Sequence, residues 1–139
     1  MSRIEWDEAL SVKNDEIDGQ HKKWIEIHNR LHEVLISGNM SNVDKIGVET
    51  LQAILEYARY HFKFEEDYLK MINYPGLVEH RRLHKDFDMR AYTSYRQILA
   101  GEVVLNSEIL KVMKNWLLEH ISHEDQKYRR FLHDASSGV

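Results

Sequence analysis

The sequence predicts an all-α protein: an antiparallel, up-down-up-down four-helix bundle preceded by an N-terminal arm. Three observations support this fold class. Apolar residues recur at intervals of three and four over four long segments, which is the spacing of one face of a helix. Only one proline, Pro75, occurs in 139 residues, and a chain made mostly of helix tolerates few prolines. Short polar breaks separate the segments, and short connections between long helices are typical of antiparallel bundles.

The breaks divide the chain into an arm, a helical domain and a tail. The domain is expected over residues 18–132, after an arm over 1–17 and before a flexible tail over 133–139. Within the domain, the apolar periodicity predicts helices over residues 19–36, 42–72, 75–99 and 107–132. Polar residues before these helices are expected as N-caps, namely Asp18, Ser41 or Asn42, and Asn106 or Ser107. Pro75 suits the first turn of the third helix, where a backbone N–H is not needed.

The composition excludes several classes of protein. The formal net charge is −4, whereas nucleic-acid-binding proteins usually carry a basic face. No apolar run approaches the roughly 18 residues that a membrane helix requires, and the first residues lack the apolar core of a secretory signal. The absence of cysteine excludes disulfides, zinc–thiolate sites and iron–sulfur clusters. We therefore expect a cytoplasmic protein that binds neither nucleic acid nor membranes.

Each predicted helix places histidine on the face that should point into the core. In the second helix the apolar stripe continues through His61 and Glu65, where the periodicity asks for leucine. Because a helix rises about 1.5 Å per residue, the polar positions of the other helices fall at a matching level of an antiparallel bundle. Burying a carboxylate without a partner is very costly. We therefore expect one polar cluster at one end of the bundle, formed by His21, His61, Glu65, His80, His84, His120 and either Glu124 or Asp125.

The remaining histidines fit simpler roles. His28 and His32 share the inward face of the first helix, but no carboxylate accompanies them on that face. We expect them to be hydrogen-bonded core residues. The alternative is a second metal-binding pair, because residues four apart on a helix are neighbours. His123 and His133 are expected to face solvent.

Five imidazoles and two carboxylates are a metal-binding set. A single zinc ion takes four ligands, and calcium and magnesium prefer oxygen, whereas imidazole suits iron, manganese or zinc. The set therefore predicts a pair of such ions. Each carboxylate has two oxygen atoms, so the two acidic residues are expected to bridge the ions while the histidines hold the outer positions.

Taken in order, the motifs resemble those of the hemerythrins, in particular the single-domain bacteriohemerythrins. The likeness covers residues 6–128 and is carried by Asp15-Glu16-Ile17-Asp18-Gly19-Gln20-His21, His61-x-x-x-Glu65, His80-x-x-x-His84 and Trp116-x-x-x-His120-x-x-x-x-Asp125. It implies a non-enzymatic protein that binds dioxygen reversibly for storage, delivery or sensing. The implied cofactor is a pair of iron ions in each chain (Fe2+/Fe3+) with a bridging oxo or hydroxo group.

The resemblance also implies a role for each residue of the cluster. One iron would take three imidazoles and the other two, which leaves one position open for dioxygen, and both carboxylates would bridge. Trp116 and Leu117, one turn before the last histidine ligand, would line the oxygen pocket; the alternative for both is ordinary core packing. The implied ligands are His80, His84 and His120 on one iron, His21 and His61 on the other, and Glu65 and Asp125 between them.

One spacing in this set is irregular. His120 and Asp125 are five residues apart, and a regular helix of about 3.6 residues per turn places such residues on different faces. Glu124 would share the face of His120 better. The resemblance selects Asp125, with either a local π-type widening of the helix or a sideways reach of the side chain bringing it inward. Glu124 remains the alternative.

Other functions remain open from the sequence. A di-iron enzyme could act on peroxide, nitric oxide or ferrous iron, a dizinc site could hydrolyse a substrate, and a signalling module could respond to oxygen. The chain lacks the Glu-x-x-His motifs of ferritin-like di-iron proteins, and two carboxylates leave the ion pair more positive than four would, which disfavours more oxidised iron. An oxygen-binding protein is therefore the leading hypothesis. The fourth helix has no obvious exposed apolar stripe, so we expect a monomer.

Overall fold

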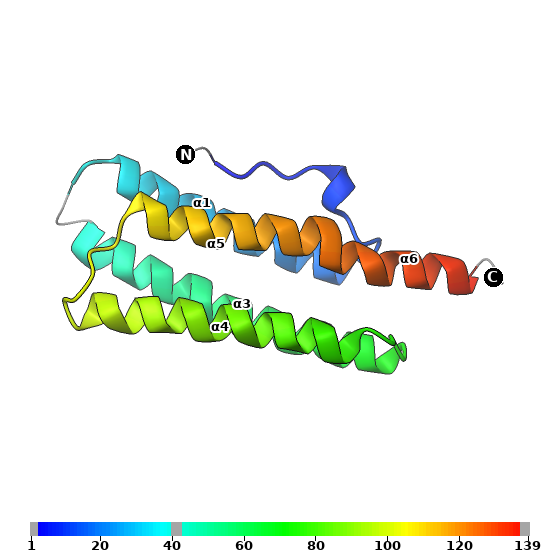
Figure 1. Cartoon of the computed structure of the whole chain (residues 1–139). Helices are drawn as coiled ribbons and strands as arrows, with labels where there is room; N and C mark the ends of the chain where they lie inside the picture. Colours follow the sequence, from blue (N-terminus) through cyan, green and yellow to red (C-terminus); the bar gives the residue numbers. More distant parts are fainter. Residues whose placement is uncertain (1–2, 40–42, 137–139) are drawn as a thin grey trace.

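Four antiparallel rods make up the fold, which is described for residues 3–39 and 43–136 in a computed structural model (Figure 1). The helices are α1 (Asp15–Ile36), α3 (Val48–Met71), α4 (Leu77–Leu99), α5 (Ser107–Glu119) and α6 (Asp125–Ser136). Both α1 and α4 pack against α3 and α5, so the rods enclose a common core. Within the residue ranges given, no strand occurs and no helix is long and apolar enough to cross a membrane. The predicted four-helix bundle is confirmed.

The first helix begins earlier than predicted. Its N-cap is Asn14, whose side chain accepts a hydrogen bond from the N–H of Ile17 at 3.1 Å. Asp18 lies inside α1 and binds the arm instead. Its carboxylate accepts hydrogen bonds from the Ser11 hydroxyl at 2.6 Å and from the N–H of Val12 at 2.9 Å. The arm therefore ends at Asn14, before the boundary predicted from Asp18.

The second predicted helix contains two kinds of helical structure. A π-helical stretch, Val43–Gly47, comes first, and the regular helix α3 follows it. The N-cap expected at Ser41 or Asn42 lies outside the described residues. Within the described residues the helical structure runs from Val43 to Met71, close to the expected span of 42–72, and its first described turn is wider than an α-helix.

The turn between α3 and α4 takes the place of the predicted first turn of the third helix. Asn73 has a left-handed backbone (φ 57°), which asparagine tolerates better than most residues. Pro75 lies in this turn, and the carbonyl of Tyr74 accepts a hydrogen bond from the N–H of Leu77 at 3.3 Å. The helix therefore begins at Leu77 and not at Pro75.

The last rod is continuous but contains one wide turn. Asn106 caps α5, as predicted, by accepting a hydrogen bond from the N–H of Ile109 at 3.0 Å. A π-helical turn, His120–Glu124, joins α5 to α6 in one line (Figure 1). Because neither glycine nor proline interrupts the sequence there, α6 continues to Ser136 and includes the start of the tail expected over 133–139. The last three residues of that tail lie outside the described ranges.

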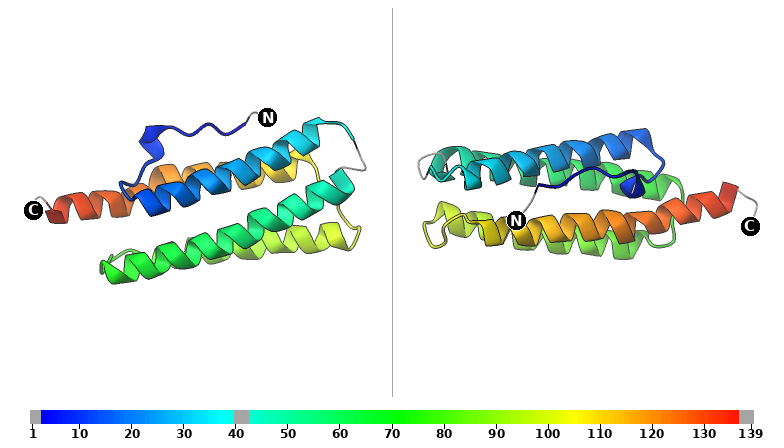
Figure 2. Two further views of the ribbon diagram at one scale, coloured as in Figure 1. Left: turned by 180° about the vertical axis from the view of Figure 1, so that it is seen from behind. Right: turned by 90° about the horizontal axis from the view of Figure 1, so that it is seen from above.

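The arm lies across α1 and the last rod, as Figure 2 shows from above. The side chain of Asn29 in α1 exchanges two hydrogen bonds with the backbone of Ile4, at 2.8 and 2.9 Å. From the other side, the amide of Gln126 donates to the carbonyls of Leu10 and Ser11 at 3.2 and 3.3 Å. These side chains form hydrogen bonds with backbone groups of the arm and hold it against α1 and α6.

The apolar core has a large and a small part. The large part fills most of the bundle and includes Trp24 and Phe62. His21 in α1 lies one turn from Trp24 on one side and one turn from Ile17 on the other, so the predicted polar cluster falls between the two parts. The small part closes the end of the bundle and is formed by Val12, Ile17, Leu69 and Tyr128.

The histidines outside the predicted cluster divide as expected between core and surface. His123 and His133 are exposed, and His28 and His32 are buried. Among the described residues, Nε2 of His28 and Nδ1 of His32 have no hydrogen-bond partner, so the expected core position of both rings is confirmed, while their expected hydrogen bonding stays a prediction. Burial, together with the positive charge of Lys114 and the neighbouring His32, lowers the pKa of His28 to about 3.

This buried imidazole predicts a loss of stability in acid. Because the pKa of His28 in the fold lies below the unfolded value of about 6.5, the unfolded chain takes up the proton first as the pH falls. His28 therefore leaves the free energy of unfolding unchanged above about pH 6.5 and lowers it progressively as the pH falls towards 3. His28→Leu should therefore gain free energy of unfolding relative to wild type by up to about 1.4 kcal/mol per pH unit below pH 6.5.

Urea unfolding of both proteins between about pH 7 and pH 4.5 measures this difference. His133→Leu, at an exposed position, is the matched control and should show no such trend. A difference between His28→Leu and wild type that stays constant with pH would contradict the assignment.

Candidate metal centre

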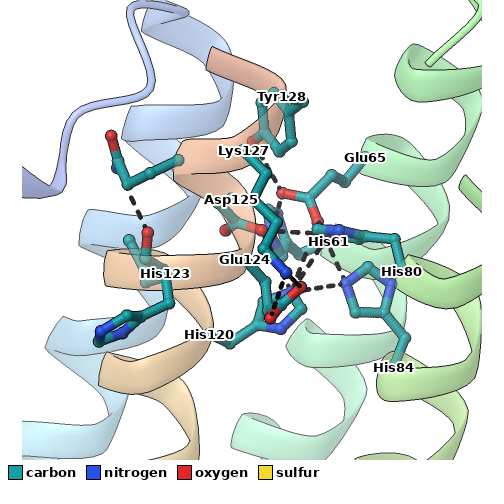
Figure 3. A network of polar contacts seen from close by, with 12 residues as sticks. His61, Glu65, His80, His84, His120, His123, Glu124, Asp125, Lys127 and Tyr128 are labelled. Carbon is teal, nitrogen blue, oxygen red and sulfur yellow. Dashed lines mark hydrogen bonds and ion pairs between the residues drawn. The ribbon is translucent and has the colours of Figure 1, made fainter. Parts of the chain in front are cut away.

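The structure brings all of the predicted cluster side chains together at one end of the bundle. They come from all four rods. Those that Figure 3 labels point toward one another, and His21 lies 3.1 Å from His61 between their Nε2 atoms. Each side chain of the cluster is buried, with at most 4% of its surface exposed. Potential metal-binding atoms form two overlapping sets, and within each set all of the atoms lie within 4.8 Å of one another. One set is formed by Glu65, His80, His84 and His120, and the other by His21, His61, Glu65 and Asp125.

The imidazoles form two groups of unequal size. We call His80, His84 and His120 the three-histidine group, and His21 and His61 the two-histidine group. In both groups the rings direct Nε2 inward. The Nε2 atoms of His84 and His120 are 3.0 Å apart, and those of His21 and His61 are 3.1 Å apart. Each group therefore converges on its own point, as the ligands of two separate ions would.

Glu65 reaches both groups with different oxygen atoms. Its Oε1 lies 2.6 Å from Nε2 of His80 and 3.1 Å from Nε2 of His84. Its Oε2 lies 3.5 Å from Nε2 of His61 and 3.9 Å from Nε2 of His21. One oxygen atom therefore faces each group, which is the arrangement of a bridging carboxylate.

Asp125 has the same division between its two oxygen atoms. Its Oδ1 is 3.1 Å from Nε2 of both His80 and His120, and its Oδ2 is 3.2 Å from Nε2 of His21. Within the described residues, neither oxygen has a hydrogen-bond partner although the side chain is completely buried. A completely buried carboxylate needs positive charge beside it, which either a metal ion or protonated imidazoles can supply.

The π-helical turn explains how Asp125 comes to lie inside the bundle. The N–H of Asp125 bonds to the carbonyl of His120, five residues earlier, so the widened turn brings both side chains to the same face. Glu124 points away and contacts Lys127, with Nζ 3.0 Å from Oε1 (Figure 3). The geometry therefore favours Asp125 over Glu124 as a member of the cluster.

Three further polar residues contact the cluster from outside, and no role was predicted for them. Gln20 accepts a hydrogen bond from Nδ1 of His61 at 2.7 Å. A second acceptor, Glu66, takes the Nδ1 hydrogen of His84 at 2.8 Å. A ring whose Nδ1 carries the hydrogen presents a lone pair on Nε2, so these acceptors fix the form of histidine that binds metal.

The third of these residues, Tyr128, donates its hydroxyl hydrogen to Oε2 of Glu65 at 3.0 Å. Gln20 and Glu66 are direct sequence neighbours of cluster residues, and Tyr128 continues the inward face of the last helix. Their adjacency to cluster residues and the helical periodicity could have indicated these three residues. Neither signal, however, shows in which direction a side chain on the flank of a helix points.

Aromatic and apolar side chains surround the polar cluster. The ring of Trp116 stacks on that of His120, with centroids 4.5 Å apart and planes at 9°. Phe62 stacks in the same way on His84, at 3.9 Å and 12°. Leu117 is 1% exposed and belongs to the main apolar core. Trp116 therefore contacts the cluster, whereas Leu117 packs in the apolar core, and the expectation that both line an oxygen pocket stays a prediction.

Without metal, the two carboxylates strongly favour protonated imidazoles. Burial opposes a positive charge on either ring, but Asp125 and Glu65 outweigh it and raise the pKa of His80 to about 10 and that of His120 to about 9. Burial likewise opposes the negative charge of each carboxylate, and the surrounding imidazoles nevertheless hold the pKa values of Glu65 and Asp125 well below their usual range. In the metal-free cluster, protons on the imidazoles thus supply the positive charge that metal ions would otherwise supply.

Metal binding should therefore release protons, because a coordinating imidazole must be neutral. At about pH 7.5, anaerobic addition of Fe2+ to the metal-free protein should displace the protons of His80 and His120, about two for each chain, in addition to any proton that a metal-bound water molecule loses. A pH indicator in weakly buffered solution measures the release.

His80→Gln should release about one proton fewer than wild type, whereas His133→Gln, far from the cluster in an exposed position, should release the same number. Equal release from all three proteins would contradict the charge state described above.

The chain is similar to several known proteins. A family model described as "Hemerythrin HHE cation binding domain" matches residues 12–132. A bacteriohemerythrin of Stenotrophomonas maltophilia is 31% identical over 92% of this chain and 80% of its own length. One from Clostridium acetobutylicum is 31% identical over 88% and 96%. A crystal structure of wild-type hemerythrin has a TM-score of 0.85 and 25% identity, and covers 93% of this chain and 97% of that one. This chain belongs to the hemerythrin family.

Proposed function

We propose that the protein binds dioxygen reversibly at a non-haem di-iron centre and serves in oxygen storage, delivery or sensing rather than as an enzyme. The observation that carries this proposal is the pair of unequal imidazole groups joined by two carboxylates. The bacteriohemerythrins that it resembles support iron as the metal. The donor set agrees, because it consists of imidazole and carboxylate groups without thiolates.

In this proposal the three-histidine group would hold one iron and the two-histidine group the other. Glu65 and Asp125 would serve as ligands to both, together with an oxo or hydroxo group from solvent. The two-histidine group supplies one imidazole fewer, so its iron would keep a position for dioxygen. When bound, the reduced iron pair supplies the electrons that make dioxygen binding possible.

The residues around the cluster would keep this chemistry reversible. Trp116 and Leu117 are the proposed apolar lining on the oxygen side, where they would exclude water and proton donors. The phenol of Tyr128 already donates its hydrogen to Glu65 and holds that carboxylate in its bridging orientation. The small apolar layer beyond Tyr128 separates the cluster from the end of the bundle.

The charge of the donor set supports binding of oxygen over its further activation. Two carboxylates offset only part of the charge of two ferrous ions, and the five imidazoles are neutral ligands. The centre would therefore stay positively charged, which opposes oxidation beyond the ferric state. This balance favours an oxygen-binding protein over an oxidase.

The test is a cycle of oxygen removal and readmission. The iron-loaded protein should contain about two irons per chain, which follows from the two convergent groups. Its visible absorption should bleach when the reduced protein is deoxygenated and return with air. A colourless protein holding zinc, or an oxidised spectrum that never reverses, would contradict the proposal.

Two neighbouring acidic residues supply the matched variants for this experiment. Asp125→Asn removes a bridging charge inside the cluster, so we expect it to lower the iron content and abolish the reversible spectrum. Glu124→Gln changes only the outward carboxylate beside Lys127 and should behave as wild type. The reverse result would assign the bridge to Glu124.

A further inference from the structure

The two imidazole groups differ in the outside partner of one ring each. His61, in the two-histidine group, donates its Nδ1 hydrogen to the neutral amide of Gln20 at 2.7 Å. His84, in the three-histidine group, donates to the carboxylate of Glu66 at 2.8 Å. The distances are nearly equal, so the difference between the two partners is one of charge.

Glu66 also connects His84 to the surface. Its Oε1 lies 3.3 Å from Nε of Arg81 in α4, and about a quarter of its side chain (24%) is exposed. A surface hollow of about 560 Å³ between α3 and α4 is lined by Glu66, His84 and Arg81 together with Lys85 and Phe62. Gln20, by contrast, is buried, with 8% of its surface exposed. The charged contact is therefore confined to one side of the centre and is open to solvent there.

A carboxylate that accepts the hydrogen of a metal-bound imidazole has two separable effects. As an acceptor it orients the ring and fixes its tautomer, and a neutral amide does this equally well. As an anion it strengthens the electron donation of the ring and adds a negative charge close to the metal, which favours ferric over ferrous iron. Arg81 opposes the second effect, because its positive charge lies on the far side of the same carboxylate.

We propose that Glu66 is a positioning residue for His84 whose negative charge, attenuated by Arg81, lowers the reduction potential of the iron pair from the three-histidine side. This inference rests on the proposed function only in taking the metal to be iron. It makes the two sides of the centre electronically unequal beyond the difference in their number of imidazoles. It also places the residues that set the potential at the surface hollow between α3 and α4.

The experiment separates orientation from charge by comparing two substitutions of the same residue. Glu66→Gln keeps an oxygen acceptor for Nδ1 of His84 and removes the charge, reproducing the partner that His61 has. We expect it to retain its iron and to shift the midpoint potential upward in an optical redox titration. Glu66→Ala removes the acceptor as well and should weaken iron binding by about 10- to 100-fold.

Two arginine variants test the opposing cation. Arg81→Gln should shift the potential downward, because Glu66 would then act without its counter-charge. Arg82→Gln is the matched control: Arg82 is the next residue of α4, and its guanidinium pairs with Glu79 at 2.7 Å on the exposed surface. It should leave the potential unchanged. The reciprocal variant Gln20→Glu should lower the potential from the other side of the centre.

Each result bears on the inference. A Glu66→Gln potential equal to that of wild type, with iron fully bound, would overturn the role of the charge. Equal loss of iron from Glu66→Gln and Glu66→Ala would do the same, since the amide would then fail to replace the carboxylate. A wild-type protein that takes up no iron would overturn both proposals. Protein that binds iron and shows these shifts, but no reversible oxygen spectrum, would refute only the oxygen-binding proposal.

Discussion

The structure depends on burying two carboxylates and five imidazoles together in the core of a small helical bundle. Removing charged groups from water costs several kcal/mol for each ion unless they are well paired, and a bundle of this size has little stability to spare. The cost of burial is clearest for Asp125, because its buried oxygens have no hydrogen-bond partner within the described residues. Divalent cations between the two imidazole groups would offset this cost. On the proposed function, the metal would contribute to the stability of the fold together with the apolar layers on either side.

The helical geometry gives each cluster residue its place. Residues four apart, as in His61 and Glu65, share one face and one level of a straight helix. Asp125 needs the wider turn at His120–Glu124, because a regular helix would have directed Glu124 inward instead. Irregular helical turns of this kind are often found at functional sites. The arm and the small apolar layer then close the end of the bundle, with Asp18 holding the arm by two hydrogen bonds.

Much of this arrangement could be predicted from the sequence, and the exceptions have physical causes. The inward faces of the helices identified the imidazoles, since histidine at a core position is conspicuous on an apolar stripe. Asp18 looked like a helix cap because it precedes an apolar run, but Asn14 fills that role and Asp18 binds the arm. Periodicity alone favoured Glu124, and only a resemblance to known sequences selected Asp125. Gln20 and Glu66 lie on the flanks of their helices, where periodicity does not say whether a side chain turns inward.

The proposed function depends on two ions lying between two specific groups of side chains. Crystals of the iron-loaded protein measured at the iron absorption edge test it directly through the anomalous difference map. We expect two separate peaks, one among the rings of the three-histidine group and one beside His21 and His61, each in contact with Glu65 and Asp125. A single peak, or iron bound away from these two carboxylates, would contradict it.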